Sequence, residues 1–316
     1  KIYDKPNNNI VNSIPATPVV ITADAVQGKY SGALVYVNDL EGKITKINMT
    51  NLSGNFSFDP TSGIVSQGAS NQNIQMFDQY TFFDLEATTV RTSSTNSNNR
   101  YMYHSMDAGI GSTTGNLWLF GATGDYLNLS DTGIIDPENN VKNVIFGIKD
   151  YYFPFFGQAS TSTGNTIDTL QECKNMTGNT TSCDAKTKRG WYINLSGGYK
   201  VTAEPTFAKG VAYYPIFAPV RNNVSCGSGD AYVCGIEAEC GKNISSELDQ
   251  NNSSSFAARD CFKVGTGVLS KVVVFGSNLY ANISDESDNQ NKTDIVVINA
   301  IDRSTYDFRN SWRENF

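Results

Sequence analysis

The stretch RGWYINLSGGYKVTAEPTFAKGVAYYPIFAP, residues 189–219, decides the fold. It consists of short aromatic and β-branched runs, interrupted by Ser-Gly-Gly, by Glu204-Pro205 and by Gly210. Short runs of this composition, closed by glycine and proline, are typical of strands and hairpins. We therefore expect two pairs of strands here, within a chain built in the same way throughout.

The flanking sequence carries the same pattern. Residues 35–50, VYVNDLEGKITKINMT, predict a hairpin around Asp39-Leu40-Glu41-Gly42, because both arms carry β-branched residues. Apolar runs that end in Phe-Gly recur at irregular intervals, at Phe120, Phe146 and Phe275, and regular helical periodicity is hard to find. The sequence predicts an all-β fold of repeated antiparallel sheets with loops of variable length, as in a β-propeller.

Composition excludes several classes of function. The 316 residues carry a formal net charge of −7, whereas nucleic-acid binders and proteins that adsorb to anionic lipid cluster Lys and Arg. Only 17% of residues are charged, and a surface rich in Asn, Ser, Thr and Gly is common outside the cytoplasm. Residues 1–9 lack Met and a hydrophobic signal core, so we interpret the chain as processed or as a fragment.

The six cysteines are read as disulfides, which implies an oxidising compartment. A zinc site is disfavoured because no two of them have Cys-x2-Cys spacing and the only histidine is distant in sequence. Six cysteines allow 15 pairings, and sequence alone does not choose among them. We expect neighbours to pair, because each pair closes a short loop between strand runs. The expected pairs are Cys173 with Cys183, Cys226 with Cys234, and Cys240 with Cys261. The region 220–265 is accordingly predicted to be a cysteine-rich, disulfide-stapled insertion, and we expect its part from Cys226 to Cys261 to be a contact region.

Residues suited to catalysis are scarce. The single histidine, His104, lies in an aromatic run and is interpreted as a packed residue of a strand. Asp107, Asp125 and Asp150 each follow an apolar run, where aspartate commonly caps a turn. Paired carboxylates of a glycosidase, brought together from distant loops, stay open as an alternative. We predict no enzymatic activity and assign no catalytic, cofactor-binding or metal-binding residue.

The sequence patterns for calcium and glycan sites are weak. An EF-hand-like loop is not satisfied by DAVQGKYSG, where Asp24 is the only acidic residue, nor by 284–294, SDESDNQNKTD, which lacks the glycine and the spacing. The sequons at Asn48, Asn128 and Asn194 are expected by chance in so Asn-rich a chain.

One aromatic run is the sharpest candidate for a contact surface. Six large apolar residues in a row cannot all point to one face of a strand, so some of them cover a neighbouring element or stay exposed. Packing on the adjacent sheet and a partner site are both open. The candidate partner-binding residues are Tyr151, Tyr152, Phe153, Phe155 and Phe156.

Several segments of this chain, taken in their order along the sequence, resemble the C-terminal domain of the PilC/PilY family. This family comprises type IV pilus biogenesis factors and tip adhesins of Gram-negative bacteria. The resemblance is carried, in order, by NSIPATPVV, VYVNDLEGKITKINMT, LWLFGATGDYL, VIFGIKD, GWYINL, KVTAEPTFAKGVAYYPIF, CGSGDAYVCGIEAECG, VGTGVLSKVVVFG, DIVVINA and SWRE. The Asn-rich surface is closer to the PilC proteins of Neisseria and Kingella than to the pseudomonad branch.

The resemblance implies a fold and an organisation. It implies an all-β modified β-propeller built of antiparallel sheets, with residues 1–316 as the later part of the ring of a longer protein. Some members carry an Asp-rich calcium loop before the Val-Tyr-x-x-Asp-Leu motif, and only Asp24 is acidic in that place here. Any calcium is therefore expected to bind through residues outside this segment, and no other cofactor is expected.

The resemblance also implies a function. It suggests a non-enzymatic, exported protein at the bacterial outer membrane, cell surface and pilus tip, which supports pilus assembly against retraction and attaches to host cells. The partners would be pilin or minor pilins and a host-cell receptor, with peripheral association with the outer membrane and no nucleic acid. Two alternatives stay open: a secreted or periplasmic propeller enzyme, of glycosidase or quinoprotein type, and an extracellular receptor-type binding module.

Overall fold

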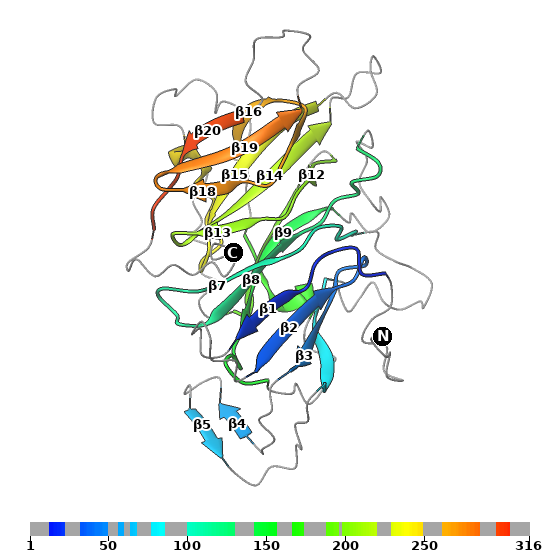
Figure 1. Ribbon diagram of the computed structural model, residues 1–316, viewed down its shortest axis with the longest axis vertical. Helices are drawn as coiled ribbons and strands as arrows, with labels where there is room; N and C mark the ends of the chain where they lie inside the picture. Colours follow the sequence, from blue (N-terminus) through cyan, green and yellow to red (C-terminus); the bar gives the residue numbers. More distant parts are fainter. Residues whose placement is uncertain are drawn as a thin grey trace.

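In a computed structural model, the regular structure of the described residues is almost entirely β-strand (Figure 1). The structure describes residues 13–22, 32–49, 77–85, 100–129, 142–156, 166–173, 188–195, 198–219, 229–248, 261–284 and 295–303, and the backbone of 56–59 and 64–67. Within these ranges the only helices are single 3-10 turns at Ile167–Thr169 and Ser245–Glu247. None of the helices in this part of the chain has the length and apolarity needed to cross a membrane.

The first sheet is antiparallel and has the order β1-β2-β3-β6. Asp39 closes its central hairpin by accepting the backbone N–H groups of Glu41 and Lys43, each at 3.0 Å. Gly42 follows with φ of 84°, a conformation that side-chain-bearing residues rarely adopt. The hairpin predicted at residues 35–50 is confirmed. The strands are β1 (Val19–Thr22), β2 (Ala33–Asn38), β3 (Lys43–Asn48) and β6 (Gln79–Asp84).

The second sheet has the order β10-β11-β9-β8-β7, in which only β10 pairs in parallel. Strands β8 and β9 are buried on both faces, which explains their almost continuous apolar sequences. Glycine is needed in them because a Cβ at Gly121 would meet the Phe146 ring, and one at Gly147 would meet Trp191. The strands are β7 (Asp107–Ile110), β8 (Leu117–Ala122), β9 (Val144–Asp150), β10 (Gln171–Glu172) and β11 (Gly190–Asn194).

The third sheet is built on two long strands that pair along their whole length. These are β14 (Val211–Pro219) and β15 (Gly229–Glu237). The sheet order is β12-β14-β15-β16, and β13 also pairs with β14. The shorter strands are β12 (Lys200–Val201), β13 (Thr206–Ala208) and β16 (Phe262–Thr266).

The fourth sheet is centred on β19 (Asn278–Ser284). Strands β17 (Val268–Leu269), β18 (Val273–Phe275) and β20 (Ile295–Asn299) all pair with it in antiparallel fashion. A separate hairpin is formed by β4 (Phe56–Asp59) and β5 (Ile64–Gln67), which lies at the lower end of the view in Figure 1.

Three hydrophobic cores join the four sheets in chain order. The first lies between sheets one and two and includes Tyr36 and Phe146; the second lies between sheets two and three and includes Trp191 and Tyr214. The third joins the third and fourth sheets. Figure 1 shows the same succession, from the first sheet in blue to the fourth in orange and red. The prediction of an all-β fold made of several antiparallel sheets is confirmed.

Buried polar groups also bridge the sheets. The hydroxyl of Tyr214 in the third sheet donates to the carbonyl of Phe146 in the second at 2.8 Å. Trp191 Nε1 donates to the carbonyl of Ala238 at 2.7 Å, and Thr202 Oγ1 donates to Leu269 at 3.0 Å. These bonds fix how neighbouring sheets sit, because an unmade hydrogen bond in such a buried place costs about 1 to 3 kcal/mol.

Three expectations about local structure were wrong. Strands β11 and β12 belong to different sheets, so the Ser-Gly-Gly segment links two sheets and does not close a strand pair. The region 220–265 is not an insertion throughout, because β15 and the start of β16 are integral strands of the third sheet. His104 lies in the irregular stretch before β7 and not in a strand. Residues 220–228 and 249–260 lie outside the described ranges.

Candidate functional site

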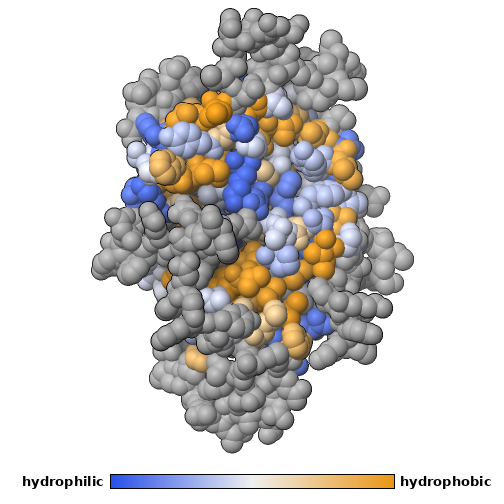
Figure 2. All heavy atoms as spheres, viewed as in Figure 1, coloured by the Kyte–Doolittle hydropathy of each residue, from blue (hydrophilic) through white to orange (hydrophobic). Residues whose placement is uncertain are grey.

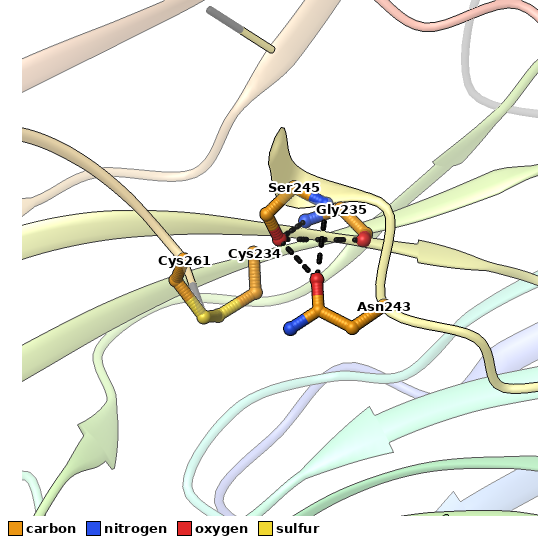
Figure 3. Close-up of a disulfide and its surroundings, with 5 residues drawn as sticks. All are labelled: Cys234, Gly235, Asn243, Ser245 and Cys261. Carbon is orange, nitrogen blue, oxygen red and sulfur yellow. Dashed lines mark hydrogen bonds between the residues drawn. A yellow bond between two sulfur atoms is a disulfide. The ribbon is translucent and has the colours of Figure 1, made fainter. Parts of the chain in front are cut away.

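The cysteines of the third sheet form a disulfide that differs from the expected pairs (Figure 3). Cys234 in β15 is bonded to Cys261, which directly precedes β16, with a Cα–Cα distance of 4.5 Å. The two strands are antiparallel neighbours, and the pairing of Val233 with Phe262 places the cysteines opposite each other. The expected pairs Cys226–Cys234 and Cys240–Cys261 are therefore wrong: sheet register, and not loop length, selects the partners.

The other cysteines fall into two groups. Cys240 is a free thiol, the only one in the described ranges, and burial as the main cause raises its pKa to about 12. Cys173 is disulfide-bonded. Cys183 and Cys226 lie outside the described residues, so the Cys173–Cys183 bridge stays a prediction.

Beside the disulfide, the chain after β15 is held by Ser245 (Figure 3). Its hydroxyl accepts the Gly235 N–H at 2.9 Å and donates to Asn243 Oδ1 at 2.6 Å. The Ile244 N–H donates to the Gly235 carbonyl at 2.9 Å. Disulfide and hydrogen bonds together make this part of the predicted contact region a rigid part of the framework.

A buried ion pair joins the first two sheets. Lys46 Nζ lies 2.5 Å from Asp150 Oδ2, and both side chains have an exposed fraction of 0%. The Tyr36 hydroxyl donates to the same carboxylate oxygen, and the carbonyl of Phe155 accepts from Lys46 at 3.0 Å. Burial lowers the pKa of Lys46, an effect that Asp150 opposes, and burial raises the pKa of Tyr36. We interpret this cluster as structural because every charge in it has a partner.

The aromatic run after β9 is a turn that packs on this cluster. Phe156 has an exposed fraction of 6%, so it belongs to the core and is not available to a partner. Its ring lies edge-on to Tyr80 at 5.1 Å, and its carbonyl accepts from the Tyr80 hydroxyl. The remaining aromatic residues of the run are half-buried. They keep partly exposed surface, so their partner role stays a prediction; they are Tyr151, Tyr152, Phe153 and Phe155.

The three aspartates after apolar runs each have a separate partner. Asp107 Oδ2 accepts the Phe207 N–H at 2.7 Å and so joins the second sheet to the third. Asp125 Oδ1 accepts the Leu127 N–H at 3.1 Å, a turn cap of the expected kind. Asp150 accepts the Tyr152 N–H at 3.0 Å besides its contact with Lys46. The described ranges hold no group of three or more acidic, histidine or cysteine residues placed to bind a metal ion.

A surface groove of about 800 Å³ is the candidate binding site. It lies where the loop after β8 and the chain after β12 meet the fourth sheet. Tyr126, which is 43% exposed, lines it and packs against the His104 ring in a T-shaped arrangement, with ring centroids 5.5 Å apart. The lining residues within the described ranges are Tyr126, Thr202, Val268, Leu269, Ser270, Asn282, Ile283, Ser284 and Ile295.

Next to the groove, the fourth sheet turns an apolar face outward. Val273, Phe275, Ile295 and Val297 are 54 to 76% exposed. The strand register places Val273 and Val297 on either side of Tyr280. Figure 2 shows one side of the whole molecule, in the same view as Figure 1. On this side hydrophobic residues gather in an upper and a lower area, with hydrophilic residues between them.

Sequence reasoning missed the groove and the buried ion pair. Tyr126 lies in LWLFGATGDYL, a segment noted only for its family likeness. Lys46 had a readable signal: in β3 it stands between β-branched residues, at a position whose partner in β2 is Tyr36. The groove had no such signal, because its lining comes from five separate places in the chain.

Comparison with known proteins gives one structure to report. This chain is similar to the crystal structure of the Pseudomonas aeruginosa PilY1 C-terminal domain. The match covers 88% of this chain and 62% of the PilY1 chain, with 13% sequence identity and a TM-score of 0.45. The chain thus spans less than two thirds of that structure. No family model matches the sequence, and no curated protein matches it.

Proposed function

We propose that this chain belongs to a non-enzymatic, exported protein of the type IV pilus system, which supports pilus assembly against retraction and mediates attachment to host cells. The single observation that carries the proposal is where the family-like segments fall. VYVNDLEGKITKINMT contains most of β2 and all of β3, VIFGIKD is β9, and KVTAEPTFAKGVAYYPIF contains β12, β13 and most of β14. The resemblance thus lies in the buried strands that define successive sheets, and not in a short surface motif.

Two further features support an extracellular binding role. The Cys234–Cys261 disulfide fits an oxidising compartment such as the periplasm or the cell surface. The ion pair and the bridging hydrogen bonds fix the sheets against one another, and a rigid scaffold with binding surfaces on its loops is a common design for recognition. No cofactor is assigned to this segment, and calcium, where it acts, would bind through residues outside it.

The proposed partners follow from the same reading. Pilin or minor pilins at the pilus tip would contact the half-buried aromatic turn after β9, at Tyr151 and Phe153. A host-cell receptor would contact the loop-rich surfaces, and the protein would associate peripherally with the outer membrane. Deleting residues 226–261 would not test these contacts, because it would remove β15 from the centre of the third sheet.

The assembly role is tested by deleting the gene in its native host, with and without the pilus retraction motor. We expect few surface pili by electron microscopy in the retracting strain and normal numbers when retraction is disabled, because the protein would oppose retraction and not build the fibre. Complementation with the wild-type gene and with Leu127→Ser, a change at an 80% exposed residue away from the aromatic turn, should restore piliation equally. Normal piliation after deletion in both backgrounds would remove the assembly role.

Attachment is tested separately in the retraction-deficient background, where pilus number is held equal. We expect the deletion strain to adhere less to host cells than the complemented strain. Equal adherence would remove the attachment role and leave the assembly role standing. The Tyr151→Ala and Phe153→Ala variants test the aromatic turn in the retracting strain, where a loss of piliation without a loss of secreted protein is the expected result.

A further inference from the structure

We infer that the groove beneath Tyr126 is a binding site for a neutral carbohydrate, of the size of a di- or trisaccharide. This inference rests on the attachment role proposed above and names the chemical class of the ligand. The volume of the groove, about 800 Å³, falls within the range of roughly 300 to 1,000 Å³ that is typical of small-molecule sites.

The lining combines two kinds of surface. Val268, Ile283 and Ile295 provide apolar surface beside the Tyr126 ring, and hydroxyl or amide groups come from Thr202, Ser270, Asn282 and Ser284. A sugar ring has an apolar C–H face and a rim of hydroxyl groups. An aromatic side chain with a polar end, next to hydroxyls and an amide, complements both of these features.

The groove carries no charged side chain among its described lining residues. The adjacent charges neutralise each other: Lys271 Nζ lies 2.6 Å from Glu204 Oε1. A charged ligand would lose its hydration here without gaining an ionic partner among the described lining residues. The site therefore favours a neutral ligand over an acidic or basic one.

The walls of the groove are preorganised. Ser270 Oγ accepts the Asn282 N–H at 2.9 Å, and Ser284 Oγ accepts the Val268 N–H at 3.0 Å, so the two serines bind β17 to β19. Thr202 Oγ1 donates to the Leu269 carbonyl at 3.0 Å and so ties the chain after β12 to β17. A groove that is already ordered loses less conformational entropy on binding.

Two polar groups are left to contact a ligand. Within the described part of the chain, neither the Asn282 side-chain amide nor the Tyr126 hydroxyl makes a hydrogen bond. His104 packs against Tyr126 in a T-shaped arrangement and so helps to hold the tyrosine ring in place. An amide, a hydroxyl and an aromatic ring are the kinds of group that orient a sugar.

The experiment measures binding of the purified protein to an array of neutral glycans and their sialylated counterparts, followed by titration calorimetry with N-acetyllactosamine, maltotriose and chitotriose. We expect at least one neutral di- or trisaccharide to bind, with little dependence on salt because no charges pair. Tyr126→Ala should weaken binding about tenfold, the change that about 1.4 kcal/mol represents, whereas Tyr126→Phe, which keeps the ring and loses only the hydroxyl, should weaken it less. Asn282→Ala should weaken it as well, and Leu127→Ala, one residue from the ring, should not.

Each other outcome overturns the inference. No binding across the array, binding that Tyr126→Ala leaves unchanged, or salt-sensitive binding of sialylated glycans alone would each do so. Binding of peptides from a displayed library at the same groove, without glycan binding, would also overturn it. Circular dichroism of each variant guards against loss of fold. Because the assay uses purified protein, its failure is distinct from a failure of the piliation and adherence tests.

Discussion

At the scale of single residues, Lys46 and Asp150 show how much depends on one buried charge pair. The pair lies between the first two sheets with no exposed surface on either side chain, and Tyr36 and the Phe155 carbonyl complete its shell. Removing one partner of a buried pair costs far more than the intact pair contributes, because the remaining charge is left without compensation.

We predict that Lys46→Met lowers the free energy of unfolding by about 3 to 5 kcal/mol, since it leaves the Asp150 carboxylate buried in the core without its charged partner. Urea denaturation followed by tryptophan fluorescence measures this. Lys263→Met is the matched control, because Lys263 pairs with Asp230 at 2.7 Å but is 42% exposed. Exposed pairs of that kind contribute at most about 1 kcal/mol. Equal effects of the two substitutions would contradict the structural role of the buried pair.

His104 makes stability depend on pH. Burial lowers its pKa below the ordinary 6.5, an effect that Glu204 partly opposes, and its buried Nε2 has no hydrogen-bond partner among the described residues. The unfolded chain therefore takes up a proton before the folded chain does, and stability falls as pH drops below about 6.5.

We predict that His104→Gln flattens the dependence of the unfolding midpoint on pH between about 7 and 5, because His104 is the only histidine in the chain. Guanidinium denaturation at a series of pH values measures the slope. A slope in the variant as steep as in the wild type would show that other groups cause it.

These two residues mark what sequence can and cannot predict at this scale. The interpretation of His104 as a packed residue agrees with its half-buried ring beside Tyr126, although the expected strand around it does not form. Asp125 caps a turn as its position suggested. Asp150 does more, because its partner Lys46 lies 104 residues earlier and only the packing of two sheets brings them together.

At the scale of elements, the disulfide between β15 and β16 fixes the third sheet. It closes a loop with a sequence separation of 27 residues, which corresponds to about 3 to 4 kcal/mol in the chain-entropy model. We predict that the double substitution Cys234→Ala and Cys261→Ala destabilises the protein by about this amount. Thermal unfolding under non-reducing conditions measures the loss, and reducing agent should then have no further effect from this bond.

Cys240 is a free thiol, in contrast to the disulfide-bonded Cys234 and Cys261. Its pKa of about 12 leaves almost no thiolate at neutral pH, and its side chain is half-buried. We predict that it reacts with iodoacetamide only after unfolding, because the thiolate is the reactive form. Peptide mass spectrometry of native and denatured samples reads this out, and rapid alkylation in the native state would contradict the placement.

Hairpins with local turn signals were predictable from the sequence, whereas disulfide partners that lie far apart in the sequence were not. Residues 35–50 specified β2 and β3 because Asp39 and Gly42 determine the turn between them. The pairing Cys234–Cys261 depends on the register of two strands separated by residues 238–261, and no local signal encodes that register. The assumption of short loops failed for this reason.

At the scale of the whole molecule, four sheets, antiparallel except for the pairing of β10, follow one another in chain order and share three cores. This succession was readable from irregularly spaced apolar runs separated by Gly and Pro. The groove was not, because its walls come from elements up to 169 residues apart, from Tyr126 to Ile295 (295 − 126 = 169). The sequence predicts the sheets, and their packing creates the surface.

The central claim, that the protein acts on type IV pili at the cell surface, is tested most directly by where it is found. Pili are sheared from intact cells, purified, and probed with an antibody against this chain, in parallel with a strain that lacks the major pilin. We predict that the protein is present in the sheared-pilus fraction of the piliated strain and absent from the equivalent fraction of the pilin-null strain. Detection only inside the cell, or in equal amounts in both sheared fractions, would contradict the claim.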